Sequence, residues 1–108
     1  MTNNVKVEQY YNKNQFIIYC KGEIYLQSYE STVAVIKTDH TLTLGRDWDY
    51  SNTTRKHLYL FIKEYGLAIC EAEREPLKSA LNSTNIKKAI QSLIDNNIIS
   101  FNPDLGEE

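Results

Sequence analysis

The densest polar chemistry of the chain lies in the eleven residues from Asp47 to His57. This stretch holds the only Trp, two acids and a run of hydroxyl and amide side chains, followed by Arg55, Lys56 and His57. If a helix begins here, its free amides, the neighbouring hydroxyls and the two cations could together bind a phosphate. The residue types therefore raise the hypothesis of an anion-binding site.

A structural role accounts for the same residues without any ligand. Cations in the first turn of a helix are disfavoured by about 0.3–1 kcal/mol, because the helix dipole is positive there. Such exceptions gather at functional sites or where a local group compensates them. Asp47 and Asp49 stand just upstream and are expected to neutralise the two cations. Trp48 would then fill the seam between a sheet and the helix, and Ser51 would cap the helix. We favour this structural interpretation.

No catalytic arrangement is expected. Ser51 and His57 are close in sequence, but nothing in the sequence indicates that the hydroxyl is activated. Glu71, Glu73 and Glu75 could act as a metal-binding or acid–base group, yet on a helix they would diverge, so a solvated face is the better interpretation. Phosphate-loop, dinucleotide and metalloprotease motifs are absent. We expect a protein that is not an enzyme and that uses no metal or cofactor.

Tyrosine is abundant, with eight residues in 108. Five of them lie in the first 29 residues: Tyr10, Tyr11, Tyr19, Tyr25 and Tyr29. An exposed row of Tyr on a sheet face would suit a protein interface or the stacking of nucleotide bases. The net charge of −2 and the pI near 5.7 favour a protein partner, because nonspecific nucleic-acid binding usually shows as a basic domain.

The hydrophobic pattern changes from alternation to helical spacing along the chain. The predicted strands cover residues 16–20, 23–29, 32–37, 41–44 and 98–101, and the predicted helices cover 52–66, 77–81 and 84–95. Gly66 should stop the first helix, Ser83 should cap the last one, and Asn96–Asn97 should end it. The result is an α+β fold, in which an antiparallel β-meander of three to five strands packs against two or three helices.

The chain is long enough for one domain, residues 1–108, with termini expected to be loose at about 1–10 and 102–108. A short edge strand near Val5 and Val7 is the alternative for the first segment. No apolar run could span a membrane, and the N-terminus has no signal-peptide core. We expect a cytoplasmic protein of a bacterial host cell, with Cys20 and Cys70 as free thiols.

Two segments carry a resemblance to a group of small proteins. The segments are Ser28-Tyr29-x-Ser31-x-Val33-Ala34-x-Ile36 and Trp48-Asp49-Tyr50-Ser51-x-Thr53-Thr54-x-Lys56-His57-Leu58. In them the chain resembles uncharacterised proteins of phages, prophages and other mobile elements of low-GC Gram-positive bacteria. The resemblance implies no catalytic residue. It implies a context in which small proteins often bind and block a host protein, as anti-CRISPR proteins do.

The expected function is non-enzymatic binding that modulates a host protein, such as a CRISPR effector nuclease or another defence protein. The alternative is a nucleic-acid-binding accessory protein that uses Arg46, Arg55 and Lys56 on phosphate. A homodimer through the sheet edge is left open. The candidate binding residues are Arg46, Trp48, Tyr50, Thr53, Arg55, Lys56, Tyr25 and Tyr29.

Overall fold

The computed structural model describes residues 5–29 and 31–106. They form an α+β fold, as predicted, with six strands where three to five were expected. The strands are β1 (Lys6–Tyr10), β2 (Asn12–Cys20), β3 (Glu23–Ser28), β4 (Ser31–Ile36), β5 (Leu42–Gly45) and β6 (Ser100–Asn102). The helices are α1 (Asn52–Phe61), the π-helical turn η1 (Ile62–Gly66), α2 (Leu67–Ile69), the 3₁₀ turn η2 (Glu71–Glu73), α3 (Arg74–Leu81) and α4 (Ile86–Asp95).

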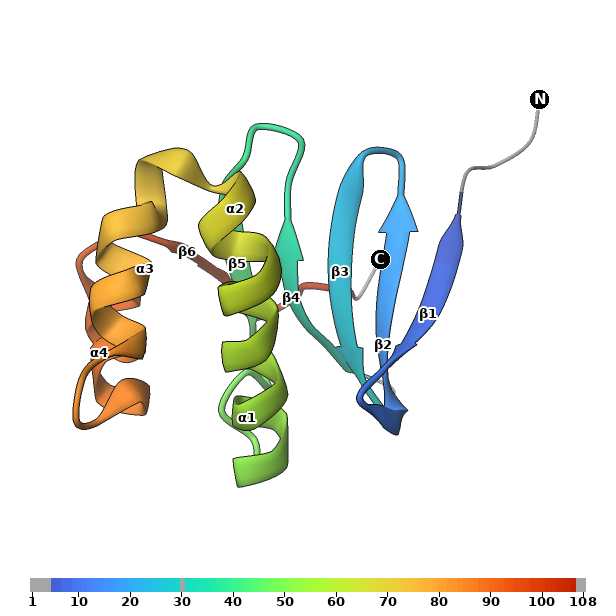
Figure 1. Cartoon of the computed structure of the whole chain (residues 1–108), viewed down its shortest axis with the longest axis horizontal. Coiled ribbons are helices and arrows are strands. Elements are labelled where there is room, and N and C mark those ends of the chain that lie inside the picture. The colour runs from blue at the N-terminus through green and yellow to red at the C-terminus, as the bar shows by residue number, and fades with distance from the viewer. Residues whose placement is uncertain (1–4, 30, 107–108) are drawn as a thin grey trace.

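The sheet is the predicted meander with one parallel strand added. Strands β1 to β5 pair antiparallel in chain order, and β6 joins β5 in parallel. One cross-strand row joins Ile17, Leu26, Ala34 and Leu44, all of them buried. The helices stand on one side of the sheet, with α3 and α4 towards the β6 end and β1 at the opposite end (Figure 1). The core therefore lies between this row and the helices.

The first helix does not stop at Gly66, so that prediction is wrong. α1, η1 and α2 follow one another without a break from Asn52 to Ile69, and Gly66 has helical dihedral angles. A Cβ at Gly66 would lie 3.3 Å from a methyl carbon of Ile62 and 3.9 Å from one of Leu77. A side chain here would crowd Ile62 one turn earlier in the same helix and would meet Leu77 of α3 in ordinary contact, and the chain leaves the helix only at Cys70.

The helix caps are partly as predicted. Ser51 caps α1 by accepting a hydrogen bond from the amide of Thr54 at 3.1 Å. Asn85, and not Ser83, caps α4 by accepting from the amide of Lys88 at 3.1 Å. The predicted end of α4 is confirmed, because Asn97 adopts a left-handed conformation with φ 57°. Asn tolerates that conformation better than most residues do.

Trp48 occupies the seam between the sheet and the helices, as predicted. It is 2% exposed and packs in the same buried cluster as Leu44, Leu58 and Phe61. The turn that carries it begins at Gly45, whose carbonyl oxygen accepts from the Trp48 amide at 3.2 Å. A Cβ at Gly45 would lie 2.5 Å from the carbonyl oxygen of Thr32, so only glycine allows this close approach of β4.

The N-terminal tyrosines do not form the exposed row on the sheet that was considered from the sequence, because Tyr10 is buried and Tyr19 is partly buried. The hydroxyls of Tyr10 and Tyr11 both donate to the carboxylate of Glu64, the first at 2.6 Å, and the Tyr19 hydroxyl lies 3.1 Å from that of Tyr65. The hydrogen bond with Tyr19, together with burial, raises the pKa of Tyr65 to about 12. These contacts tie the β1–β2 hairpin to η1.

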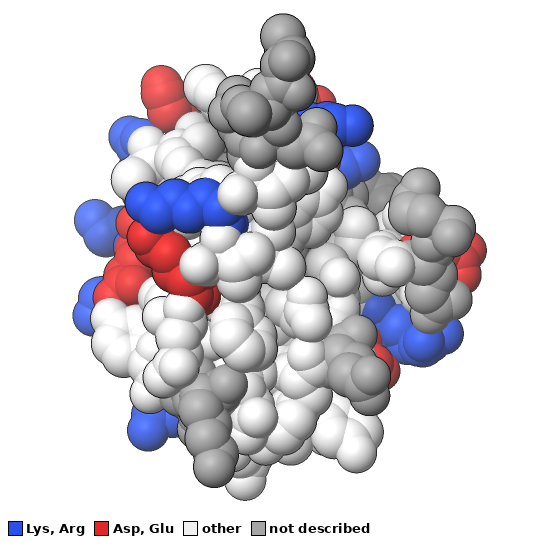
Figure 2. All heavy atoms as spheres, turned by 90° about the vertical axis from the view of Figure 1, so that its right-hand side faces the viewer, with Lys and Arg blue, Asp and Glu red and all other residues white. Residues whose placement is uncertain are grey.

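Residues 1–4 and 107–108 of the termini expected to be loose lie outside the described residues. Lys6–Tyr10 forms the edge strand β1. Gly106 lies against Thr32, so the segment after β6 runs back across β4, behind the sheet in Figure 1. The β1 side shows a broad surface with few charges between charged margins (Figure 2). Among the described residues, no helix has the length and apolar character needed to cross a membrane.

The seam residue yields a stability prediction. Trp48→Ala should lower the free energy of unfolding by about 3–5 kcal/mol, because it leaves a cavity in the core. Tyr50→Ala is the matched control, since Tyr50 is 79% exposed, and it should change this free energy by less than about 0.5 kcal/mol. Urea unfolding followed by circular dichroism measures both. If both substitutions lowered the free energy of unfolding equally, Trp48 would not be the residue that stabilises the seam.

Candidate functional site

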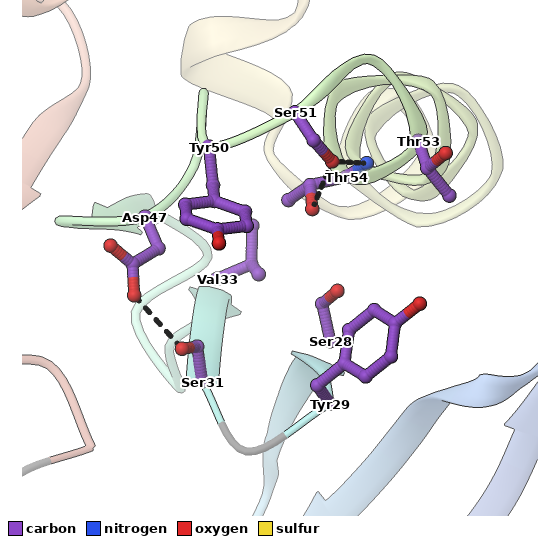
Figure 3. A pocket seen from close by; sticks show the side chains of 9 residues that line it. All are labelled: Ser28, Tyr29, Ser31, Val33, Asp47, Tyr50, Ser51, Thr53 and Thr54. Atoms are coloured by element: carbon purple, nitrogen blue, oxygen red, sulfur yellow. Dashed lines mark hydrogen bonds between the residues drawn. The ribbon is translucent and has the colours of Figure 1, made fainter.

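A pocket of about 550 Å³ opens between the β3–β4 hairpin and the start of α1 (Figure 3). Three segments line it: the hairpin, the connection from β5 to α1, and the first turn of α1. The lining residues are Ser28, Tyr29, Ser31, Val33, Asp47, Tyr50, Ser51, Thr53 and Thr54. Seven of these nine carry a hydroxyl group, so we call this cavity the hydroxyl pocket.

The hydroxyl pocket has a buried floor and an aromatic rim. Ser28, Val33 and Thr54 are buried, whereas Tyr29 and Tyr50 are 59% and 79% exposed. The two rings stand on opposite sides of the pocket (Figure 3). The Ser28 hydroxyl accepts from the buried Gln15 amide at 2.8 Å, which fixes its position. A ligand would meet polar groups at the bottom and aromatic surface at the entrance.

Asp47 is the only charged side chain among the described residues that line the pocket. Its carboxylate accepts from the Ser31 hydroxyl at 2.8 Å and lies 3.9 Å from Nε of Arg46 at the surface. The other polar groups are hydroxyls, which donate and accept. This combination suits a cation or a neutral hydrogen-bond donor and offers no positive side chain to a phosphate.

The expected neutralisation of the two cations by Asp47 and Asp49 is wrong. The Arg55 guanidinium donates to the carbonyl oxygen of Asp49 at 3.1 Å and to the amide oxygen of Asn52. The Asp49 carboxylate instead lies 4.0 Å from Nζ of Lys87. Backbone and amide oxygens therefore compensate Arg55, because the carboxylates of the preceding turn point to other partners.

Arg55 and Lys56 line a second hollow on the other side of α1. It has a volume of about 390 Å³, and we call it the basic groove. Its lining residues are Asn52, Arg55, Lys56, Tyr59, Leu60, Lys63, Leu81 and Ile86. Thr53 lines the hydroxyl pocket instead. The predicted anion site is thus divided between two hollows, with the hydroxyls in one and the cations in the other.

The remaining candidate residues lie apart. Arg46 lines a third hollow of about 150 Å³ beside Pro103 and Leu105. Trp48 is core. Tyr25 pairs with Ile18 and Val35 in the sheet and points to the face away from the helices, where it donates to Glu23 at 2.5 Å.

The hairpin half of the pocket was not predicted from the sequence; it consists of Ser28, Ser31 and Val33. A signal was present, however. Eight of the nine lining residues stand at named positions of the two segments that carry the resemblance, and the ninth, Asp47, directly precedes the second segment. The fold brings these two segments together at one pocket.

A model of DUF8033, a family of unknown function, matches residues 4–75 of the chain. The chain belongs to this family. The part matched to DUF8033 includes the whole lining of the hydroxyl pocket, but Leu81 and Ile86 of the basic groove lie beyond it. No curated protein and no solved structure gave a match.

One of the three glutamates expected on a solvated face is buried, which corrects that prediction. Glu73 is 8% exposed, and its carboxylate accepts from the Leu42 amide at 2.9 Å, at the start of β5. Burial raises the pKa of Glu73, and burial also raises the pKa of the neighbouring Cys70 to about 12. Neither residue lines the two main hollows. Their role is structural.

The Ser51–His57 pair considered from the sequence is explained by packing and helix capping. His57 is buried, and its Nδ1 lies 2.8 Å from the carbonyl oxygen of Thr53. The Ser51 hydroxyl is used in capping and bonds to Thr54. Among the described residues, no group of three or more His, Cys, Asp or Glu is placed to hold a metal ion.

Glu73 yields a prediction about pH. Its pKa in the folded state is raised above the ordinary 4.5, so the protein is stabilised while Glu73 is protonated, and stability falls as the pH rises through the folded pKa. Glu73→Gln should therefore gain stability relative to wild type as the pH increases from 4 to 8. Urea unfolding across this range measures the difference. The exposed Glu75→Gln should follow wild type; a pH-independent difference for Glu73→Gln would contradict the assignment.

Tyr29 yields a prediction about strain. Its φ of 55° is in the left-handed region, which glycine adopts without the steric cost of a side chain. Tyr29→Gly should leave the free energy of unfolding unchanged or raise it by up to about 1 kcal/mol. Lys21→Gly, at φ 53° in an exposed turn, should behave alike. A clear loss for Tyr29→Gly alone would show that its ring stabilises the fold.

Proposed function

We propose that this protein is a non-enzymatic binding protein that recognises a partner protein at the hydroxyl pocket. The observation that supports this is the pairing of a buried polar floor with two exposed tyrosine rings. Tyrosine is enriched at energetically dominant positions of protein interfaces, because it buries a large rigid surface and still offers a hydroxyl. Tyr29 and Tyr50 have no evident structural reason to be so exposed, and at Tyr29 the backbone is strained as well.

The chemistry of the pocket favours a partner's Lys or Arg side chain as its occupant. Asp47 supplies the negative charge, and the rings of Tyr29 and Tyr50 supply faces that attract cations. The buried hydroxyls of Ser28 and Thr54 could accept hydrogen bonds from the same group. A neutral donor would use the hydroxyls but not the charge.

The lining chemistry supports binding over catalysis. A hydroxyl becomes a nucleophile only when a base lies within hydrogen-bond reach. Among the described lining residues the hydroxyls of Ser31 and Ser51 bond to Asp47 and Thr54, and none bonds to an imidazole or an amine.

The wider proposals rest on the resemblance described above. They are that the protein comes from a phage or another mobile element, that it works in the cytoplasm of a bacterial cell, and that its partner is a host protein such as an antiviral nuclease. A small chain with an aromatic-rimmed pocket is compatible with such an inhibitor. The family match adds no activity to this argument.

The nucleic-acid alternative has weaker support. Its three cations do not share one surface hollow, because Arg46 lines the third hollow while Arg55 and Lys56 line the basic groove. The net charge is −2, and the described residues on the β1 side form no continuous basic stripe (Figure 2). Affinity for nucleic acid depends chiefly on cations that follow the phosphates.

Pull-down from host-cell lysate with quantitative mass spectrometry tests the proposal. Tyr50→Ala should reduce the amount of the specific partner at least about tenfold, as expected for an interface hot spot. Asp47→Asn keeps the acceptor for Ser31 but removes the charge, and it should weaken capture as well if the occupant is a cation.

Asp49→Asn is the matched control, because Asp49 lies two residues away and does not line the pocket. It should retain the partner. Two results would contradict the proposal: wild-type protein that recovers no specific partner, or a partner recovered equally by Tyr50→Ala and wild type. If the partner is lost with Tyr50→Ala but kept with Asp47→Asn, the pocket remains the proposed binding site and a cationic occupant is excluded.

A further inference from the structure

The basic groove runs along one face of α1. Asn52, Lys56, Tyr59 and Lys63 recur at spacings of three to four residues, so they lie above one another on the helix. From Asn52 to Lys63 the helix rises on the order of 16 Å. The opposite wall comes from the end of α3, at Leu81, and the start of α4, at Ile86. Figure 1 shows α3 and α4 standing in the same layer beside α1.

The groove combines apolar and positively charged lining. Leu60, Leu81 and Ile86 give it aliphatic surface, all of them partly exposed. Three cations belong to the same lining, and no described lining residue is acidic. Asp49, which precedes the helix, does not line the groove, and its carboxylate lies 4.0 Å from Nζ of Lys87. The Arg55 guanidinium is held in place by two hydrogen bonds, so its charge is positioned before any partner arrives.

We propose that the basic groove docks an acidic amphipathic segment of a partner protein. Aliphatic side chains of that segment would cover Leu60, Leu81 and Ile86, and its carboxylates would face the three cations. The length of the groove matches about ten residues of a helix at 1.5 Å per residue. Recognition of an amphipathic helix through anchors three to four residues apart is a common mode of peptide binding. This site is separate from the hydroxyl pocket and does not depend on it.

The lining favours a protein segment over nucleic acid. Burial of aliphatic side chains stabilises a complex by roughly 25 cal/mol per Å² of apolar surface, but a phosphate backbone has little such surface to offer. Base stacking requires exposed aromatic rings, and among the described lining residues Tyr59 is the only one with a ring and is partly buried. An acidic amphipathic segment, in contrast, complements both the charge and the apolar surface.

Fluorescence anisotropy with synthetic probes tests the docking site on the full chain. The main probe is a labelled 14-residue helical peptide with Leu on one face and Glu on both flanks. A second peptide has Gln in place of every Glu, and a third has the same composition with the Leu residues dispersed around the helix. A single-stranded DNA of 20 nucleotides is the fourth probe. We expect the first peptide to bind at least about tenfold more tightly than the other three.

Charge reversal identifies the groove. Lys56→Glu with Lys63→Glu should weaken binding of the acidic peptide at least about tenfold, since two attractions become repulsions. Lys21→Glu with Lys37→Glu changes the net charge equally at exposed turn positions outside the groove. This control should change affinity less than about threefold. Circular dichroism checks that each variant is folded.

A measurement on wild-type protein covers the case in which the variants do not fold. Methyl NMR signals of Leu60, Leu81 and Ile86 should shift on addition of the acidic peptide. Shifts confined to other regions would overturn the proposal. It would also be overturned if both double charge reversals reduced the affinity for the acidic peptide equally. DNA that binds more tightly than the peptide, and is lost with Lys56→Glu and Lys63→Glu, would assign the groove to nucleic acid. Asp47→Asn should leave peptide binding unchanged, so failure here and failure at the hydroxyl pocket can be told apart.

Discussion

The placement of α1 against the sheet is the constraint on which the other features depend. Trp48 is buried at the seam, Gly45 allows the turn before it, and the Ser51 cap fixes where the helix begins. Once the position and the start of the helix are fixed, helical geometry determines which side each residue of its first turns faces. Thr54 faces the β3–β4 hairpin, while Lys56 faces α3 and α4. The hydroxyl pocket and the basic groove are thus the two sides of one helix start.

The unbroken helix after α1 extends this constraint to the far end of the sheet. The π-helical turn η1 brings Glu64 to two tyrosine hydroxyls of the β1–β2 hairpin and Tyr65 to a third. Burial and the bond to Glu64 raise the pKa of Tyr10. π-Helical turns often occur at functional positions. Here the described contacts give η1 a structural role, and they hold the hairpin that lies outside the helical layer.

Local signals predicted the elements well, and long-range contacts account for what they missed. Alternation at 41–44, the cap at Ser51 and the left-handed end at Asn97 depend on neighbouring residues, so the sequence contains them. Gly66 was predicted to stop the helix from its residue type alone. Its contact with Leu77, eleven residues away, cannot be recognised in the sequence. The hairpin half of the hydroxyl pocket was missed for the same reason, since only strand pairing places it beside the helix start. Glu73 was misplaced because its acceptor role depends on Leu42, in a distant strand.

The two hollows have opposite electrostatic character although they share α1. Asp47 gives the hydroxyl pocket one negative charge, whereas three cations line the basic groove across a helix only about 10 Å in diameter. A uniform polyanion would gain at one hollow and be repelled at the other, so nucleic acid cannot use both. A partner protein can present opposite charges at that spacing. Charge complementarity of this kind adds more to the choice of partner than to raw affinity. The arrangement therefore favours a selective protein interface around the start of α1 over a general anion-binding surface.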